Sequence, residues 1–286
     1  GGTDGSIRIW DASSGDPLAH LTGHSGLVRS VAWSPDNTQL ASGGADGSIK
    51  LWDASSGEEL THLTGHQGSV RSVAWSSDGT KLASSSYDGS IRLWDTTNGE
   101  ELTHLTGHSG SVWSVAWSSD GTKLASSSYD ESIRLWDAAS GEPLAHLTGH
   151  QGSVWSVAWS SDGTKLASGG TDGSIRLWDT TNGEQLANLT GHQDWVRSVA
   201  WSSDGTKLAS GGADGSIKLW DATSLREVRR IDQFPGADYA VWNSDGSLAS
   251  ATAGTWPYLG WQVPGSNGET VTRFPAEMFI SLPFAA

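Results

Sequence analysis

Four residue types with familiar chemistry recur along the chain at fixed offsets. His24, Ser42, Asp46 and Trp52 form one such set, and the next set begins at His66. A serine, a histidine and an aspartate are the side chains of a hydrolytic triad. An enzyme needs one nucleophile, whereas this set occurs five times in the sequence. The repetition therefore favours a structural role, and we expect no enzyme activity.

Other pairs of residues resemble catalytic or metal sites only in part. His20 and His24 are four residues apart, a spacing that holds zinc on a helix. Here the first falls in a predicted strand and the second follows a glycine turn, so we expect no metal. Acidic pairs such as Glu58-Glu59 lie in predicted turns, where a solvated surface is expected rather than acid–base catalysis. No GxxxxGK[ST] loop occurs, and we expect no cofactor.

Composition narrows the fold class and the partners. The 286 residues include 37 Gly and 17 Trp, and only 17% are charged, which suits short strands joined by tight turns. The formal charge of −15 opposes binding to a phosphate backbone, so no nucleic-acid partner is expected. No apolar run approaches the roughly 20 residues that cross a bilayer, so no membrane association is expected. The absence of Cys is compatible with a reducing compartment, and we expect a cytoplasmic protein.

A period of 42 residues organises the elements that must position these side chains. Trp-Asp recurs at 10–11, 52–53, 94–95, 136–137, 178–179 and 220–221, and Gly-His at 23–24, 65–66, 107–108, 149–150 and 191–192. Within one period the segments 69–76, 80–86, 90–95 and 100–106 are rich in β-branched, aromatic and aliphatic residues. Asp-Gly and Asn-Gly dipeptides, which favour tight hairpin turns, separate them. Each period is therefore predicted to be a four-stranded antiparallel meander.

These repeated Gly-His and Trp-Asp pairs resemble the WD-repeat β-propeller family, in bacterial-type arrays of near-identical repeats. The resemblance is strong over residues 1–230 and weak over 231–275. It implies one all-β domain over 1–286, a seven-bladed β-propeller of four-stranded antiparallel blades. The expected parts are the outer half of a first blade (1–22), five regular blades (23–230), a divergent blade (231–275) and a C-terminal tail (276–286).

The first and last blades depart from this pattern. The first has only outer strands, near 6–11 and 17–22, and its inner strands are expected from upstream sequence or from the C-terminal EMFISLPFAA. We favour the first source and a chain truncated at its N-terminus. In the last blade, Gln233-Phe234 replaces Gly-His, Gly254 replaces the turn Asp, and Trp261 supplies the third-strand Trp. Because neighbouring repeats are nearly identical, self-association through the incomplete first blade is also expected.

The resemblance assigns the recurrent set to structural tetrads, which tie the turn between blades to the sheet by hydrogen bonds. The expected tetrads are His24, Ser42, Asp46 and Trp52; His66, Ser84, Asp88 and Trp94; His108, Ser126, Asp130 and Trp136; His150, Ser168, Asp172 and Trp178; and His192, Ser210, Asp214 and Trp220.

Positions at which the repeats differ are the candidates for function. The position occupied by Arg71 in one copy is Trp113 in the next. An antiparallel meander places this position at the end of the blade that carries the tetrad His and Asp, which the family calls the top face. Arg, Trp and Tyr are enriched in binding hot spots. The predicted partner-binding residues on the top face are Arg29, Arg71, Tyr87, Trp113, Tyr129, Trp155, Trp195 and Arg197.

Two classes of function fit these observations. The first is a non-enzymatic scaffold that binds a protein or peptide, such as an acidic-aromatic segment, on the top face. The second is a sensor or regulatory propeller of a larger bacterial signalling protein whose catalytic module is missing from this chain. A glycan-binding propeller is a further alternative. The sequence upstream of Gly1 would distinguish the first two, and a glycan array would test the third.

Overall fold

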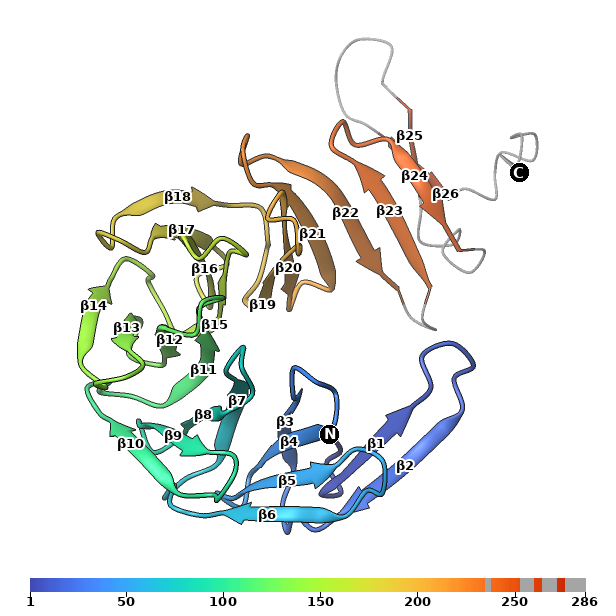
Figure 1. The fold of residues 1–286 in the computed structure, drawn as a ribbon. Helices are drawn as coiled ribbons and strands as arrows, with labels where there is room; N and C mark the ends of the chain where they lie inside the picture. Colours follow the sequence, from blue (N-terminus) through green and yellow to red (C-terminus); the bar gives the residue numbers. More distant parts are fainter. Residues whose placement is uncertain (235–237, 253–259, 264–271, 276–286) are drawn as a thin grey trace.

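Every regular element in the described part of the chain is a β-strand. The computed structural model describes residues 1–234, 238–252, 260–263 and 272–275. Its sheets follow one another around an arc, with β1 and β2 at one end and the strands β19 to β24 at the other (Figure 1). The expected all-β fold of repeated four-stranded antiparallel sheets is confirmed.

Four regular blades each contain four strands in chain order from the inside of the arc to the outside. Their bounds are β3 Val28–Trp33, β4 Gln39–Gly44, β5 Ile49–Asp53 and β6 Glu59–Leu63; β7 Val70–Trp75, β8 Lys81–Ser86, β9 Ile91–Asp95 and β10 Glu101–Leu105; β11 Val112–Trp117, β12 Lys123–Ser128, β13 Ile133–Asp137 and β14 Pro143–Leu147; and β15 Val154–Trp159, β16 Lys165–Gly170, β17 Ile175–Asp179 and β18 Gln185–Leu189. The segments expected from the sequence at 69–76, 80–86, 90–95 and 100–106 contain β7 to β10.

The remaining strands form three other sheets. β1 (Ser6–Trp10) and β2 (Pro17–Thr22) make a two-stranded sheet, as do β25 (Gly260–Val263) and β26 (Thr272–Pro275). The fifth repeat contributes β19 (Val196–Trp201), β20 (Lys207–Gly212), β21 (Ser216–Asp221) and β22 (Glu227–Gln233). It continues into β23 (Tyr239–Asn243) and β24 (Leu248–Ala251) to give six strands in one sheet.

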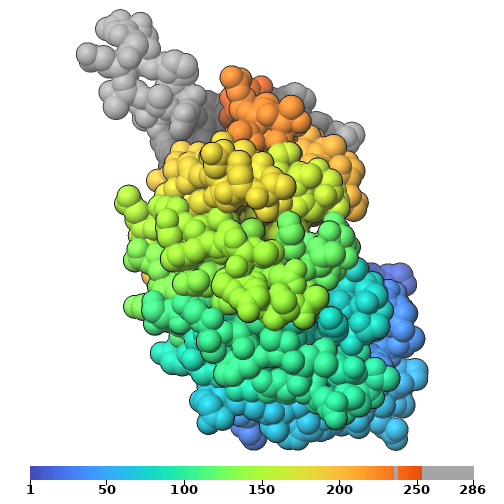
Figure 2. Space-filling model, turned by 60° about the vertical axis from the view of Figure 1, so that its left-hand side comes forward, coloured from blue at the N-terminus to red at the C-terminus, as the bar shows by residue number. Residues whose placement is uncertain are grey.

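The hydrophobic core is divided into clusters that lie between blades. Ile49, Leu51 and Leu63 of one blade pack with Val70 and Leu82 of the next, and the other neighbouring pairs repeat this arrangement. No blade can therefore bury its apolar faces alone. In the space-filling view, successive segments of the chain lie against one another as adjacent layers (Figure 2).

Inner-strand tryptophans join neighbouring blades by hydrogen bonds. The indole N–H of Trp75 donates to the carbonyl of Ala32, one repeat earlier, at 3.0 Å. Trp117, Trp159 and Trp201 make the same contact with the preceding blade at 2.9 to 3.1 Å. The inner strands are thereby held at a constant offset from blade to blade.

The end of the chain differs from the expected arrangement. Residues 239–251 do not form a sheet of their own, because β22 pairs with β23 in antiparallel register, with Arg230 opposite Trp242. The physical reason lies in the connection. Gln233-Phe234 supplies no His for a tetrad, and the amide of Phe234 instead donates to the carbonyl of Asp238 at 2.8 Å, which closes a hairpin. Within the described residues no ring of seven sheets is closed, and the count of seven blades stays a prediction. Gly254 and the tail 276–286 lie outside the described residues.

Candidate functional site

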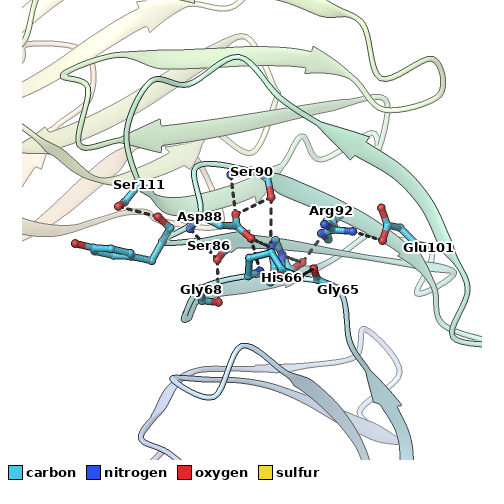
Figure 3. A network of polar contacts seen from close by, with 12 residues as sticks. Gly65, His66, Gly68, Ser86, Asp88, Ser90, Arg92, Glu101 and Ser111 are labelled. Carbon is cyan, nitrogen blue, oxygen red and sulfur yellow. Dashed lines mark hydrogen bonds and ion pairs between the residues drawn. The ribbon is translucent and has the colours of Figure 1, made fainter.

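The polar constellation that recurs in every regular repeat is the tetrad, and Figure 3 shows His66 and Asp88 of one copy together with Ser90. His66 Nδ1 lies 2.9 Å from Asp88 Oδ2, and His66 Nε2 lies 2.8 Å from Ser84 Oγ. The indole of Trp94 donates to the same Ser84 Oγ at 2.8 Å. The carboxylate can only accept, so the imidazole proton is on Nδ1, and the serine hydroxyl donates to Nε2. The polar side-chain atoms of the four tetrad residues therefore all make hydrogen bonds within the fold.

This geometry is incompatible with the hydrolytic interpretation considered for the sequence. The side chain of Ser84 is 0% exposed, so no substrate can reach its oxygen. The same contacts recur in all five tetrads, with His–Ser distances of 2.7 to 2.8 Å and Trp–Ser distances of 2.8 to 2.9 Å. The structure thus brings together all twenty residues assigned to tetrads, in five groups of four.

The aspartate of each tetrad also holds two backbone segments together. Asp88 accepts hydrogen bonds from the amides of Gln67 and Ser90 and from the Ser90 hydroxyl. Burial raises the pKa of Asp88, but the hydrogen bonds from Ser90, Gln67 and His66 outweigh it and lower the pKa to about 2. Burial lowers the pKa of His66 and keeps its imidazole neutral despite the nearby carboxylate. At physiological pH the His66 tetrad therefore holds the turn against the sheet by fixed hydrogen bonds and does not transfer a proton.

The variable position at the start of each inner strand is the extra residue of a β-bulge. Val112 lies opposite Ser128 and Ser114 lies opposite Ser127, so Trp113 between them has no cross-strand partner. The same register shift surrounds Arg29, Arg71, Trp155 and Arg197. A bulge frees a side chain from the pleat and redirects it. This explains why the fold does not dictate the residue at this position. The bulge was not expected from the sequence, because Arg and Trp both occur there and no residue type marks it.

Six of the predicted top-face residues form one continuous stack, which we call the aromatic ladder. Its members are Tyr87, Arg71, Trp113, Trp155, Arg197 and Trp195. The rings of Trp113 and Trp155 stack with centroids 4.3 Å apart. The guanidinium of Arg71 lies 4.2 Å from the Trp113 ring and 5.5 Å from that of Tyr87. The ladder therefore spans the top ends of four successive inner strands, β7, β11, β15 and β19.

The other end of the ladder is built in the same way. Arg197 lies 5.2 Å from the ring of Trp155 and 5.4 Å from that of Trp195. Trp155 and Trp195 also stack, at 6.0 Å. Each end of the ladder thus consists of one arginine and one outer aromatic residue, with the Trp113–Trp155 pair between the two ends.

Two predicted residues lie outside the stack. Tyr129 is 64% exposed, and its ring has no aromatic or cation–π partner in the described part of the chain. Arg29 is exposed on the neighbouring inner strand β3 and contributes to lowering the pKa of Arg71, an effect caused first by burial of Arg71. The structure therefore assembles six of the eight residues and leaves these two beside them.

The described residues contain neither a candidate metal-binding group nor a helix that could span a membrane. They contain no group of three or more His, Cys, Asp or Glu side chains that could hold a metal ion. His20 is separated from the tetrad residue His24 and faces Arg8 across the β1–β2 pair. No helix among these residues has the length and apolar character needed to span a membrane.

Comparisons with known proteins agree with the repeat. The family model described as WD domain, G-beta repeat matches residues 15–53, 57–95, 99–137, 141–179 and 183–221. The chain is 50% identical over 40 residues to Ribosome assembly protein 4 of Chaetomium thermophilum, which covers 14% of this chain and 8% of that protein. It is 50% identical over 42 residues to Nuclear distribution protein PAC1 of Mycosarcoma maydis, 15% of this chain and 9% of that protein. The match thus spans less than a tenth of either relative.

Proposed function

Because the chain belongs to the WD-domain, G-beta repeat family, we propose that it is a non-enzymatic scaffold that binds a protein or peptide on its top face. The observation that carries this proposal is the aromatic ladder. Four of its six members, Arg71, Trp113, Trp155 and Arg197, occupy the bulge positions at which the fold leaves the residue free, whereas the tetrads use the same residues in every copy. A role in binding accounts for a run of aromatic and arginine side chains at positions that other copies fill differently.

Exposure of the outer aromatic rings supports this assignment. Tyr87, Tyr129 and Trp195 are 59%, 64% and 42% exposed. Large aromatic side chains left in water at one rim are typical of interaction surfaces. A cytoplasmic location fits the absence of Cys and stays a prediction.

A pull-down from source-cell lysate with a paired control tests this function. The double variant Trp113→Ser, Trp155→Ser removes the centre of the ladder and should weaken the partner by about 2 kcal/mol or more, a hot-spot magnitude. Trp10→Ser is the control, since Trp10 is exposed on β1 and belongs to no ladder contact. Thermal melting verifies that each variant is folded. Recovery of every interactor by the double variant would contradict the proposal.

A second copy of this chain is a further candidate partner, for a different reason. Trp33 is 46% exposed and has no carbonyl acceptor in the described residues, unlike its four counterparts. At the other end of the arc, Ala200 is exposed, and no tryptophan among the described residues donates a hydrogen bond to its carbonyl. The β3 face of one copy and the β19 face of another therefore offer the two halves of a regular blade contact.

Light scattering at increasing concentration tests self-association. The 286-residue chain should form oligomers, and Trp33→Ser should shift it toward monomer. Leu102→Ser is the control, since Leu102 is an exposed side chain on the outer strand β10 of an interior blade. A strict monomer at high concentration contradicts this part of the proposal. The sensor and glycan alternatives remain predictions, tested by the upstream sequence and by a glycan array.

A further inference from the structure

We infer that the aromatic ladder selects an acidic, extended peptide segment, whose carboxylates meet Arg29 and Arg71 and whose backbone crosses the edges of the tryptophan rings. This inference rests on the proposed function and adds the chemical class of the partner. Two observations support it. The flat faces of the central rings are already covered within the protein, and three arginines on the top face make no ion pair among the described residues.

The flat faces of the central rings are used within the protein. Trp113 lies between Arg71 and Trp155, and Trp155 lies between Trp113 on one side and Arg197 and Trp195 on the other. A sugar ring or a methylated ammonium group needs a free aromatic face. The central rings instead present their edges, which carry the positive part of the ring quadrupole. Edges and guanidinium groups attract the same kind of ligand, an acceptor with negative charge.

The polar groups of the ladder are predominantly hydrogen-bond donors. Arg71 Nε and the indole nitrogens of Trp113 and Trp155 are buried without an acceptor in the described part of the chain. Leaving a buried donor unpaired costs about 1–3 kcal/mol. A ligand rich in carbonyl and carboxylate oxygens supplies the kind of acceptor that these donors lack.

Three arginines on the top face are unpaired, in contrast to cations on the outer strands. Among the described residues no ion pair involves Arg29, Arg71 or Arg197. On the outer strands, by comparison, Lys50 pairs with Glu59 at 2.7 Å and Lys218 pairs with Glu227 at 2.7 Å. Carboxylates from a partner would neutralise Arg29 and Arg71, and Arg29 lies close enough to contribute, after burial, to lowering the pKa of Arg71.

The tetrad aspartates and Asp194 are the acidic groups of the top face that bear on the orientation of the peptide. The tetrad aspartates accept hydrogen bonds within the fold, as shown for Asp88. Asp194 is exposed beside Trp195 and accepts its amide at 2.7 Å. We therefore expect the acidic residues of the peptide to lie toward Arg29 and Arg71, away from Asp194.

Selection from a random-peptide display library on the intact chain tests the inference. The enriched sequences should share several Asp or Glu residues. A fluorescein-labelled copy of the best sequence should bind at least about tenfold more tightly than its Asn and Gln analogue, a difference of about 1.4 kcal/mol. Enrichment of neutral or basic sequences, or of none, overturns the inference.

A matched pair of variants assigns the binding to the predicted end of the ladder. Arg29→Gln, Arg71→Gln should weaken the acidic peptide at least about tenfold, corresponding to about 1.4 kcal/mol. Lys81→Gln, Lys123→Gln removes the same charge at the opposite ends of β8 and β12 and should leave affinity unchanged. Equal loss in both variants, or tighter binding of a single-stranded oligonucleotide, overturns the inference. If the pull-down partner still depends on Trp113 and Trp155 while the acidic peptide fails, only this inference is lost and the proposed function stands.

Discussion

The indole ring of Trp113 stacks on that of Trp155, which comes from the next blade, with centroids 4.3 Å apart and planes inclined by 22°. The two residues occupy equivalent β-bulges one repeat apart. The blades are therefore joined on the top face by side chains that the repeat does not specify, in addition to the shared core between them.

The Trp113–Trp155 stack should contribute measurably to folding. In a double-mutant cycle with serine at each position, urea denaturation should give a coupling free energy of about 0.5–1.5 kcal/mol, because stacked aromatic pairs have this value beyond their buried area. A cycle that combines Trp113→Ser with Trp10→Ser should be additive, since those rings make no contact with each other. A coupling of zero for the stacked pair would show that the contact does not stabilise the folded state.

Removal of a tetrad aspartate should destabilise the chain far more than removal of an exposed acid. Asp88→Ala leaves His66 and the amides of Gln67 and Ser90 without their acceptor. We expect a loss of about 1–3 kcal/mol in the free energy of unfolding, the cost of orphaned buried partners. Glu58→Ala, at an exposed turn, should change it by less than about 0.5 kcal/mol. Equal effects of the two variants in urea denaturation would contradict the assignment of tetrad and turn.

Acid should destabilise the fold through the His66 tetrad in two steps. The pKa of His66 is lowered from 6.5 by burial, so the unfolded chain takes up protons first as the pH falls below about 6.5. The pKa of Asp88 is lowered from 3.8 to about 2, so stability present above 3.8 is lost as the pH falls toward 2. Thermal melting as a function of pH should show the midpoint falling in both windows. The Asp88→Asn variant should show a smaller drop in the second window than the parent chain, and an unchanged drop argues against this mechanism.

Backbone strain at the turn that contains Glu131 can be tested by exchanging glutamate and glycine between two equivalent turns. Glu131 has a φ of 69°, and the equivalent residue in the other described turns is glycine, as at Gly89 with a φ of 86°. A side chain in this left-handed region costs about 1–2 kcal/mol. Glu131→Gly should raise the free energy of unfolding by about 1 kcal/mol, and Gly89→Glu should lower it by a similar amount. Both are measured by urea denaturation, and a stabilising Gly89→Glu change would refute the assignment of strain.

Much of the fold follows from the 42-residue period alone. The period predicts four strands in each repeat, and β7 to β10 lie within the segments expected from the sequence. The tetrad sets were visible as residues at fixed offsets, because each set is required by every blade. Contacts that every blade makes therefore appear in the sequence as the same residue types at a constant spacing.

The ladder and the end of the chain could not be predicted in the same way. The bulge at Trp113 depends on the hydrogen-bond register between β11 and β12, and no residue type marks it. The cation–π contact of Arg71 with Trp113 depends on side-chain rotamers from two blades. The pairing of β22 with β23 depends on a single connection that lacks the tetrad histidine, which leaves hairpin formation as the favourable local alternative.

The position of the core between blades has a genetic consequence. A whole repeat such as residues 107–148 carries half of each of two adjacent core clusters, and the repeats on either side supply the matching halves. An in-frame loss of this unit would join two surfaces that already fit, while bringing Arg71 into register with Trp155. Unequal recombination among these near-identical segments would thus change the recognition surface in a single event and still leave a regular core contact between the joined blades.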